Sequence, residues 1–269
     1  NSNMHISKFL TFLSIASLAS SLPLNVTVGC DPEAFIQIKK NSVANTRVVS
    51  NMYNYQASSF NSNSNSQVCQ PFSIDFGSAT DFSMFDVEYC PNNARLSNGL
   101  LQLDLTKECG TTLIYNQPIR RGRVDVVMKP APSSGSVTAL VFSGPPPSDE
   151  IDIEFVGRDP TQVQSMYFVK GSRIELQSQF HSSFPVSDMT KVFNTYSFEL
   201  TDKAVNWFLN GDLVRTLPNK GSLTFPGDIT NFRFGVWDGS NTSGWAGTID
   251  WSIGSRSAFI KSISIKPYC

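Results

Sequence analysis

Charged residues are scarce in this sequence and nearly balanced in sign. Its 269 residues include 21 Lys and Arg against 22 Asp and Glu, so the formal net charge is −1. Nucleic acids and anionic membrane surfaces are bound by clustered Lys and Arg. The one basic cluster, residues 120–123, is short, and we interpret it as a solvated strand end. The composition therefore argues against nucleic acid or a membrane surface as the main partner.

The sequence also lacks the common signatures of metal and nucleotide sites. Its five cysteines include no Cys-x-x-Cys pair, and their spacings fit no zinc module. There is no phosphate-binding glycine loop, no heptad run, no internal repeat and no convincing long amphipathic helix. We therefore expect no metal, no cofactor and an architecture without long helices.

Residues 4–21 are typical of a secretory signal peptide. Met4 begins the segment, Lys8 supplies a positive charge, and a short apolar run ends at small residues that suit cleavage. The apolar run is too short to span a bilayer comfortably, and the alternative is a buried N-terminal helix. Two glycosylation sequons, at Asn25 and Asn241, fit a secreted protein as well.

Secretion would oxidise the cysteines. Cys90 and Cys109 are candidates to join neighbouring strands, and Cys30 and Cys69 are candidates to close an N-terminal loop. Cys269 would then be free. Because Cys269 directly follows a strand-like run with no hydrophobic tail, we expect no membrane anchor.

Residues 71–269 have the texture of one all-β domain, whereas residues 22–70 are rich in Asn and Ser and predict no packed core. After residue 71, short apolar or alternating runs recur between Gly, Pro, Asn or Ser. Two pairs, Asn98-Gly99 and Asn210-Gly211, are favoured two-residue hairpin turns. Evenly spaced short strands predict an antiparallel sandwich or barrel. The runs that we interpret as strands are Phe72–Phe76, Leu100–Leu105, Gly122–Met128, Val137–Phe142, Ile151–Phe155, Gln164–Phe168, Thr195–Leu200, Val205–Leu209, Phe232–Val236 and Ser257–Ile265.

The strongest sign of function is the stretch Asp149-Glu150-Ile151-Asp152-Ile153-Glu154-Phe155. In a β-strand, successive side chains leave on opposite faces. The apolar residues therefore point to one face, and Glu150, Asp152 and Glu154 point to the other. Three neighbouring carboxylates repel one another and lower the stability of the fold unless they serve a function.

Paired carboxylates on one face are typical of glycoside chemistry. Glu150 and Glu154 lie four residues apart, about 13 Å between Cα atoms at roughly 3.3 Å per residue. Side chains that lean together on a curved sheet can approach the separation of about 5–5.5 Å that a retaining pair of nucleophile and acid/base needs. Asp152 lies between them and can share a proton, which splits the pKa values of its neighbours. The alternatives are a solvated strand face and a Ca²⁺ site.

Further segments narrow the interpretation of this stretch. They are Val156–Asp159, Thr161–Ser165, Phe168, Lys170-Gly171, Gly235–Trp237 and Ala246–Trp251. Together with the acidic stretch, they resemble the fungal Crh branch of glycoside hydrolase family sixteen, the chitin–glucan transglycosylases. The resemblance runs from about residue 72 to residue 265.

The resemblance implies a β-jelly roll of two curved antiparallel sheets, concanavalin-like, with the sugar across the concave sheet. It implies Glu150 as nucleophile, Glu154 as general acid/base and Asp152 as an auxiliary residue. The expected activity is that of a secreted retaining transglycosylase, active in the extracellular space or cell wall as a monomer. It would cleave a β-linked wall polysaccharide, with chitin as donor, and transfer it to β-glucan or chitin. The alternatives are a family-sixteen endo-β-glucan hydrolase and a lectin-like jelly roll that binds wall glycan without turnover.

The same resemblance suggests residues that bind the substrate, since aromatic rings stack on sugar faces. Of two neighbouring aromatic residues on one strand, Phe168 rather than Tyr167 is expected in the cleft. Trp207 is expected in the core, and for His181 a structural hydrogen bond is an alternative role. The residues predicted to bind substrate are Gln162, Gln164, Phe168, Lys170, His181, Trp237, Trp245 and Trp251.

Three features depart from the Crh pattern. Phe155 and Arg158 stand where the branch more often has Trp and Gly, and we expect both side chains to lie outside the carboxylate face. The loop at residues 238–244 is less rich in glycine than usual. The plant xyloglucan-acting branch is a poorer match, because it usually has His at the position of Ser148.

Overall fold

The computed structural model describes residues 69–173 and 177–269. The predicted signal peptide, residues 4–21, lies outside the described residues, as do Asn25, Cys30 and nearly all of the Asn/Ser-rich segment. Within the described ranges, no helix is both long enough and apolar enough to cross a membrane.

The described residues form sixteen β-strands and two short 3₁₀ helices. Each of the ten runs predicted from the sequence overlaps a strand. The strands that the ten runs do not include have two to seven residues, and several lie at a sheet edge. The strands are β1 (Phe72–Asp75), β2 (Phe85–Tyr89), β3 (Ala94–Ser97), β4 (Leu100–Leu105), β5 (Thr111–Tyr115), β6 (Gly122–Lys129), β7 (Ser136–Ser143), β8 (Glu150–Val156), β9 (Val163–Val169), β10 (Ser172–Arg173), β11 (Gln179–His181), β12 (Asn194–Leu200), β13 (Ala204–Leu209), β14 (Asp212–Pro218), β15 (Asn231–Asp238) and β16 (Arg256–Pro267), and the 3₁₀ helices are η1 (Pro91–Asn93) and η2 (Trp251–Ile253).

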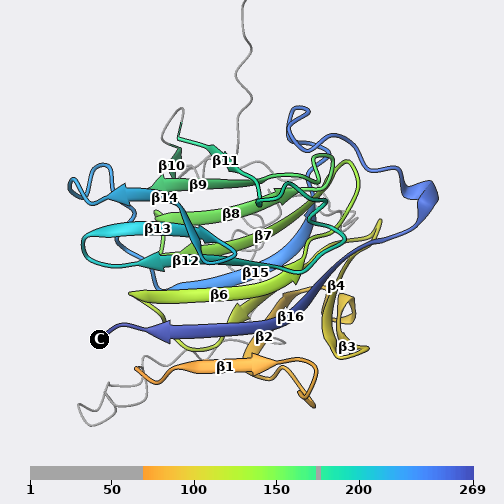
Figure 1. Cartoon of the computed structure of the whole chain (residues 1–269), viewed down its shortest axis with the longest axis horizontal. Coiled ribbons are helices and arrows are strands. Elements are labelled where there is room, and N and C mark those ends of the chain that lie inside the picture. The colour runs from red at the N-terminus through yellow and green to blue at the C-terminus, as the bar shows by residue number, and fades with distance from the viewer. Residues whose placement is uncertain (1–68, 174–176) are drawn as a thin grey trace, which may run out of the picture.

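The strands make two antiparallel sheets that face each other as a β-jelly-roll sandwich (Figure 1). The first sheet has the order β14-β13-β12-β6-β16-β4-β3, and β1 pairs with β16. The second sheet has the order β10-β9-β8-β7-β15-β5-β2, and β11 pairs with β9. The all-β architecture predicted from the spacing of short strands is confirmed.

Both predicted hairpin turns are confirmed. Asn98 and Gly99 connect β3 to β4, and both residues have positive φ angles, 52° and 72°. Asn210 and Gly211 connect β13 to β14 with φ angles of 53° and 89°. Two successive positive φ angles are what a type I′ turn requires, which is why Asn-Gly is favoured there.

One large apolar core fills the space between the sheets. Alternate residues of facing strands supply it, as the pattern of β6 illustrates: Val124, Val126 and Met128 are buried. Burying a side chain of this size stabilises the fold by about 1.5–3 kcal/mol. Trp207 is buried in this core, as predicted.

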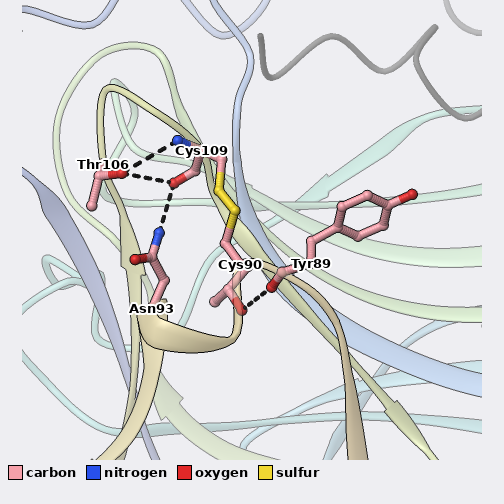
Figure 2. Close-up of a disulfide and its surroundings, with 6 residues drawn as sticks. Tyr89, Cys90, Asn93, Thr106 and Cys109 are labelled. Atoms are coloured by element: carbon pink, nitrogen blue, oxygen red, sulfur yellow. Dashed lines mark hydrogen bonds between the residues drawn. A yellow bond between two sulfur atoms is a disulfide. The ribbon is translucent and has the colours of Figure 1, made fainter. Parts of the chain in front are cut away.

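Two disulfides join described residues, and one of them differs from the prediction. Cys90 and Cys109 are paired as expected, and Figure 2 shows the bond between the end of β2 and the loop after β4. The predicted pairing of Cys69 with Cys30, with Cys269 free, is wrong, because Cys69 is bonded to Cys269. The reason is strand pairing: β1 runs antiparallel to β16, so the residues just before β1 and just after β16 meet, with Cα atoms 6.1 Å apart.

Candidate active site

Strand β8 carries the acidic stretch and separates its side chains as predicted. Ile151, Ile153 and Phe155 point into the core between the sheets. Glu150, Asp152 and Glu154 leave on the opposite side of the second sheet, which we call the carboxylate face. Asp152 is 2% exposed, whereas the two glutamates on either side of it remain partly open to solvent.

Strand register defines the neighbours of each carboxylate. Residues directly opposite one another in antiparallel strands have side chains on the same face. The rows across β7, β8 and β9 are Ser143–Glu150–Phe168, Val141–Asp152–Met166 and Ala139–Glu154–Gln164. The three carboxylates are therefore flanked by small, apolar or amide side chains, with no charge on either adjacent strand of this face.

Burial and mutual repulsion keep protons on this cluster at neutral pH. The pKa of Asp152 is raised well above its usual range, first by burial and then by the charges of Glu150 and Glu154. Protonated Asp152 donates a hydrogen bond to Glu150, and this bond opposes the rise that burial causes in the pKa of Glu150. The arrangement favours negative charge on Glu150.

Glu154 has the opposite tendency. Burial, followed by the charge of Glu150, raises its pKa to about 8, and Arg173 opposes this rise. A carboxylic acid that keeps its proton near neutral pH is suited to general acid catalysis. At one end of the strand, a hydrogen bond thus favours the ionised form of Glu150, and at the other end Glu154 keeps its proton near neutral pH.

Three hydrogen bonds hold the start and the middle of β8 in place. The Asp149 carboxylate accepts hydrogen bonds from the backbone N–H of Lys170, at 2.7 Å, and of Asp228, at 2.8 Å. Beneath the strand, the indole N–H of Trp207 donates to the backbone carbonyl of Asp152 at 3.0 Å. The core and two loops thus fix the backbone that carries the carboxylates.

A pocket of about 120 Å³ opens beside Glu154. Trp245 forms one wall, and its indole N–H donates a 3.0 Å hydrogen bond to the side-chain carbonyl of Gln164. Phe180 on β11 forms another wall, with 54% of its surface exposed. The pocket therefore offers aromatic surfaces and polar groups next to the proposed acid. The remaining lining residues are Val156, Arg158, Asp159 and Gln162.

Several residues predicted to bind substrate lie on or beside the carboxylate face. Phe168 is opposite Glu150, and Tyr167 points into the core, as the alternation predicted. Trp237 on β15 stacks on Trp245, with ring centroids 6.2 Å apart. Gln162 and Gln164 line the pocket.

Two other predicted residues, His181 and Trp251, lie away from the carboxylate face. His181 is opposite Val163 and lies on the core side of the second sheet, where its ring contacts the hydroxyl of Ser165 at 2.8 Å. Trp251 packs against the main core from η2. Lys170 lies in the turn between β9 and β10, where its backbone N–H binds Asp149.

Three residues of the site were not predicted. Phe180 reaches the pocket because β11 pairs with the edge of β9. The sequence does not show which strands pair, so this position could not be predicted. Arg158 lines the pocket and donates a hydrogen bond to the carbonyl of Gly244, so the expectation that it lies outside the carboxylate face is wrong. Phe155 is in the core, as expected. Arg233 alternates with the buried residues Phe232 and Phe234 along β15, and this alternation could have predicted that Arg233 lies on the face away from the core.

No group of three or more His, Cys, Asp or Glu side chains in the described part of the chain is arranged to hold a metal ion. Among the three acids of β8, Asp152 instead forms a hydrogen bond with Glu150.

The fold and this acidic strand place the chain in a known class. Residues 82–253, more than half of the chain, match the glycosyl hydrolases family 16, and the chain belongs to this family. Among curated relatives, Crh-like protein 5 of Aspergillus fumigatus is 36% identical over 155 residues, which are 54% of this chain and 38% of that protein. Crh-like protein CRH11 of Candida albicans is 34% identical over 180 residues, which are 64% of this chain and 39% of that protein. The chain thus spans about two fifths of the length of these relatives.

A solved structure of Crh5 transglycosylase in complex with NAG has the same fold. Its TM-score with this chain is 0.67 and the sequence identity is 29%, over 74% of this chain and 84% of that chain. The predicted family and its fungal Crh branch are therefore supported by sequence and by structure.

Proposed function

We propose that this chain is a retaining transglycosylase that cleaves a β-linked cell-wall polysaccharide and transfers the fragment to another glycan. The observation that carries this proposal is the contrast between two glutamates on one face of β8. Burial raises the pKa of Glu150, but a hydrogen bond from Asp152 and the charge of Arg233 oppose that rise, whereas the pKa of Glu154 is raised to about 8. A retaining glycosidase needs one ionised and one protonated carboxylate at the start of the reaction.

The proposed reaction has two steps. Glu150 attacks the anomeric carbon while Glu154 gives its proton to the departing glycosidic oxygen, which leaves a covalent ester between the sugar and Glu150. Glu154, now ionised, then takes the proton of an acceptor hydroxyl. The acceptor oxygen attacks the same carbon and releases Glu150, so the configuration is retained.

The pocket beside Glu154 supports transfer over hydrolysis. The acceptor must approach the residue that takes its proton, and a positioned sugar reacts in preference to water because its orientation is already fixed. Trp245 and Phe180 provide faces on which a sugar ring can stack, and Gln164 and Gln162 provide groups for its hydroxyls. These side chains are the proposed acceptor contacts.

The proposed donor is chitin, and the proposed acceptor is β-glucan or chitin. The relatives named above carry the Crh name, and the solved Crh5 transglycosylase is in complex with NAG, which supports a chitin-type donor. We further propose that residues 71–269 act as a monomeric catalytic domain of a secreted protein in the cell wall. Oxidised Cys69, Cys90, Cys109 and Cys269 support an extracellular location.

The test is a transfer assay between chitin oligomers and fluorescent glucan oligomers, resolved by size. The native chain should produce longer labelled products, and Glu150→Gln and Glu154→Gln should each abolish them. Glu108→Gln, a matched change in an exposed turn, should leave the products unchanged. Full activity in either of the first two variants would refute the mechanism.

The same assay separates the alternatives. Shortened chitin without labelled conjugates would identify a hydrolase. Shortened glucan oligomers would identify an endo-β-glucan hydrolase. Unchanged oligomers that nevertheless bind would identify a lectin-like protein.

A further inference from the structure

Arg233 projects from β15 onto the carboxylate face, beyond the three acids of β8. It is opposite Val141 on β7, and Val141 is in turn opposite Asp152. Arg233 therefore lies two strands away from the acidic strand, on the same face. Neither the mechanism above nor the predicted substrate contacts include it.

Three hydrogen bonds fix the guanidinium group of Arg233. Its Nε and Nη2 donate to the two carboxylate oxygens of Glu88 on β2, at 2.9 and 3.1 Å. Its Nη1 donates to the hydroxyl of Ser143 at 2.5 Å. This planar, two-pronged pairing holds the charge in one place, because both ends of the guanidinium are bound.

The third contact brings the positive charge next to Glu150. Ser143 is the register partner of Glu150 on the adjacent strand, so their side chains are immediate neighbours on the same face. The Nη1 end of Arg233 thus reaches the residue beside Glu150, whereas its opposite edge is turned toward Glu88. The Arg233–Glu88 pair is partly exposed, with 30% and 26% of the side-chain surfaces accessible.

The other charged groups that face Glu150 are few. Asp152 and Glu154 lie on its own strand, and both are acids. On β7 and β9, the residues of this face are uncharged. Arg173 on β10 is opposite Phe168, which is in turn opposite Glu150, so Arg173 lies two strands from Glu150 on the other side of β8, and its charge lowers the pKa of Glu154. Arg233 is the cation whose charge lowers the pKa of Glu150.

We infer that Arg233 is a positioning residue that favours the ionised, nucleophilic form of Glu150, and that Glu88 sets how much of the positive charge Glu150 experiences. This inference rests on the proposed function of Glu150 as nucleophile. Its electrostatic part does not, because the effect of one charge on another exists whether or not the chain turns over substrate.

The direction of the electrostatic effect agrees with this geometry. Arg233 lowers the pKa of Glu150, against the rise that burial causes. Its influence is directed at one glutamate, while Glu154 keeps its pKa near 8. Different cations thus act on the pKa values of the two glutamates, which agrees with their different proposed roles.

The test is an NMR titration of the glutamate side-chain carboxyl carbons, with the Glu150 signal assigned from its absence in Glu150→Gln. Arg233→Met should move the Glu150 titration to higher pH, and Arg233→Lys should restore most of its position. Glu88→Gln should move it to lower pH, because Arg233 is then no longer neutralised. Arg123→Met removes a comparable strand arginine, paired with Asp125 on the first sheet, and should change nothing.

The pH dependence of transfer gives the second readout. In Arg233→Met, the acidic limb of the rate profile should move to higher pH while the alkaline limb stays in place. If the acidic limb moves by one pH unit, the rate on the acidic side falls about tenfold, and the full rate returns as the pH is raised. A structural role would lower the rate at every pH alike.

An unchanged Glu150 titration in Arg233→Met, in a folded variant, would overturn the inference even if transfer activity is present. Shifts of the same sign in Arg233→Met and Glu88→Gln would overturn it as well. Conversely, opposite shifts in a chain that transfers no sugar would leave the electrostatic part of this inference standing and refute the proposed function.

Discussion

The hydrogen bonds of Asp149 can be tested by removing one or both of them. Asp149 is 5% exposed, and its carboxylate accepts hydrogen bonds from the backbone N–H groups of Lys170 and Asp228, which belong to two separate loops. A hydrogen bond to a charged acceptor contributes about 1.5–3 kcal/mol. Asp149→Ala removes both and leaves two N–H groups without their acceptor, so the free energy of unfolding should fall by about 3–5 kcal/mol.

Asp149→Asn separates the two contacts. An amide has one carbonyl oxygen and therefore satisfies one of the two N–H groups, so a loss of about 2 kcal/mol is expected. In urea, where stability changes by roughly 1–3 kcal/mol per molar, the Ala variant should unfold at a midpoint lower by about 1–5 M. Asp75→Ala, which removes a carboxylate that accepts the Gly77 N–H in an exposed turn, is the matched control and should cost less than about 1 kcal/mol.

Amide hydrogen exchange provides a local readout of the same change. The Lys170 and Asp228 amides should exchange faster in Asp149→Ala, and in Asp149→Asn one of the two should keep its protection. Unchanged exchange at both amides, together with a stability loss below about 1 kcal/mol in the Ala variant, would refute the reasoning.

Three further predictions concern stability and binding. In the chain-entropy treatment, loss of the Cys69–Cys269 disulfide, which spans 200 residues, should destabilise the fold by about 5 kcal/mol, and loss of the Cys90–Cys109 disulfide, which spans 19 residues, by about 3 kcal/mol. Urea unfolding of the two Cys→Ser variants compares these losses, and equal losses would contradict the treatment. The pKa of Glu154 is raised from 4.5 to about 8, so its stabilising contribution is complete below pH 4.5 and is lost as the pH rises through 8. Glu154→Gln should remove this decline of the unfolding midpoint with pH. An equal change of the midpoint with pH in both proteins would argue against the raised pKa. Trp245→Phe keeps an aromatic ring but loses the 3.0 Å hydrogen bond to Gln164. The free energy of one hydrogen bond corresponds to a rise of about three- to tenfold in the KM for the acceptor. An unchanged KM would exclude Trp245 as an acceptor contact.

The fold and the acidic strand were accessible from sequence because both depend on local patterns. The two-residue alternation of β8 placed Ile151 in the core and Asp152 on the other face without knowledge of any partner strand. The turns at Asn98 and Asn210 were accessible for the same reason, since their positive φ angles follow from the residue types themselves.

The remainder depends on pairings between distant segments, which local patterns do not encode. Cys69 meets Cys269 because β1 pairs with β16 at the other end of the chain. Phe180 enters the pocket and His181 leaves it because of the register of β11 on β9, where a shift by one residue would exchange their faces. Arg233 reaches Ser143 because β15 lies beside β7.

The most direct test of the central claim is to trap the glycosyl-enzyme. The chain would be incubated with a slow 2-fluoro donor sugar of the chitin-oligomer type, digested, and its peptides analysed by mass spectrometry. The account predicts one sugar adduct, on Glu150, that is released when an acceptor oligosaccharide is added. An adduct on Glu154, or turnover with inversion at the anomeric carbon, would contradict it.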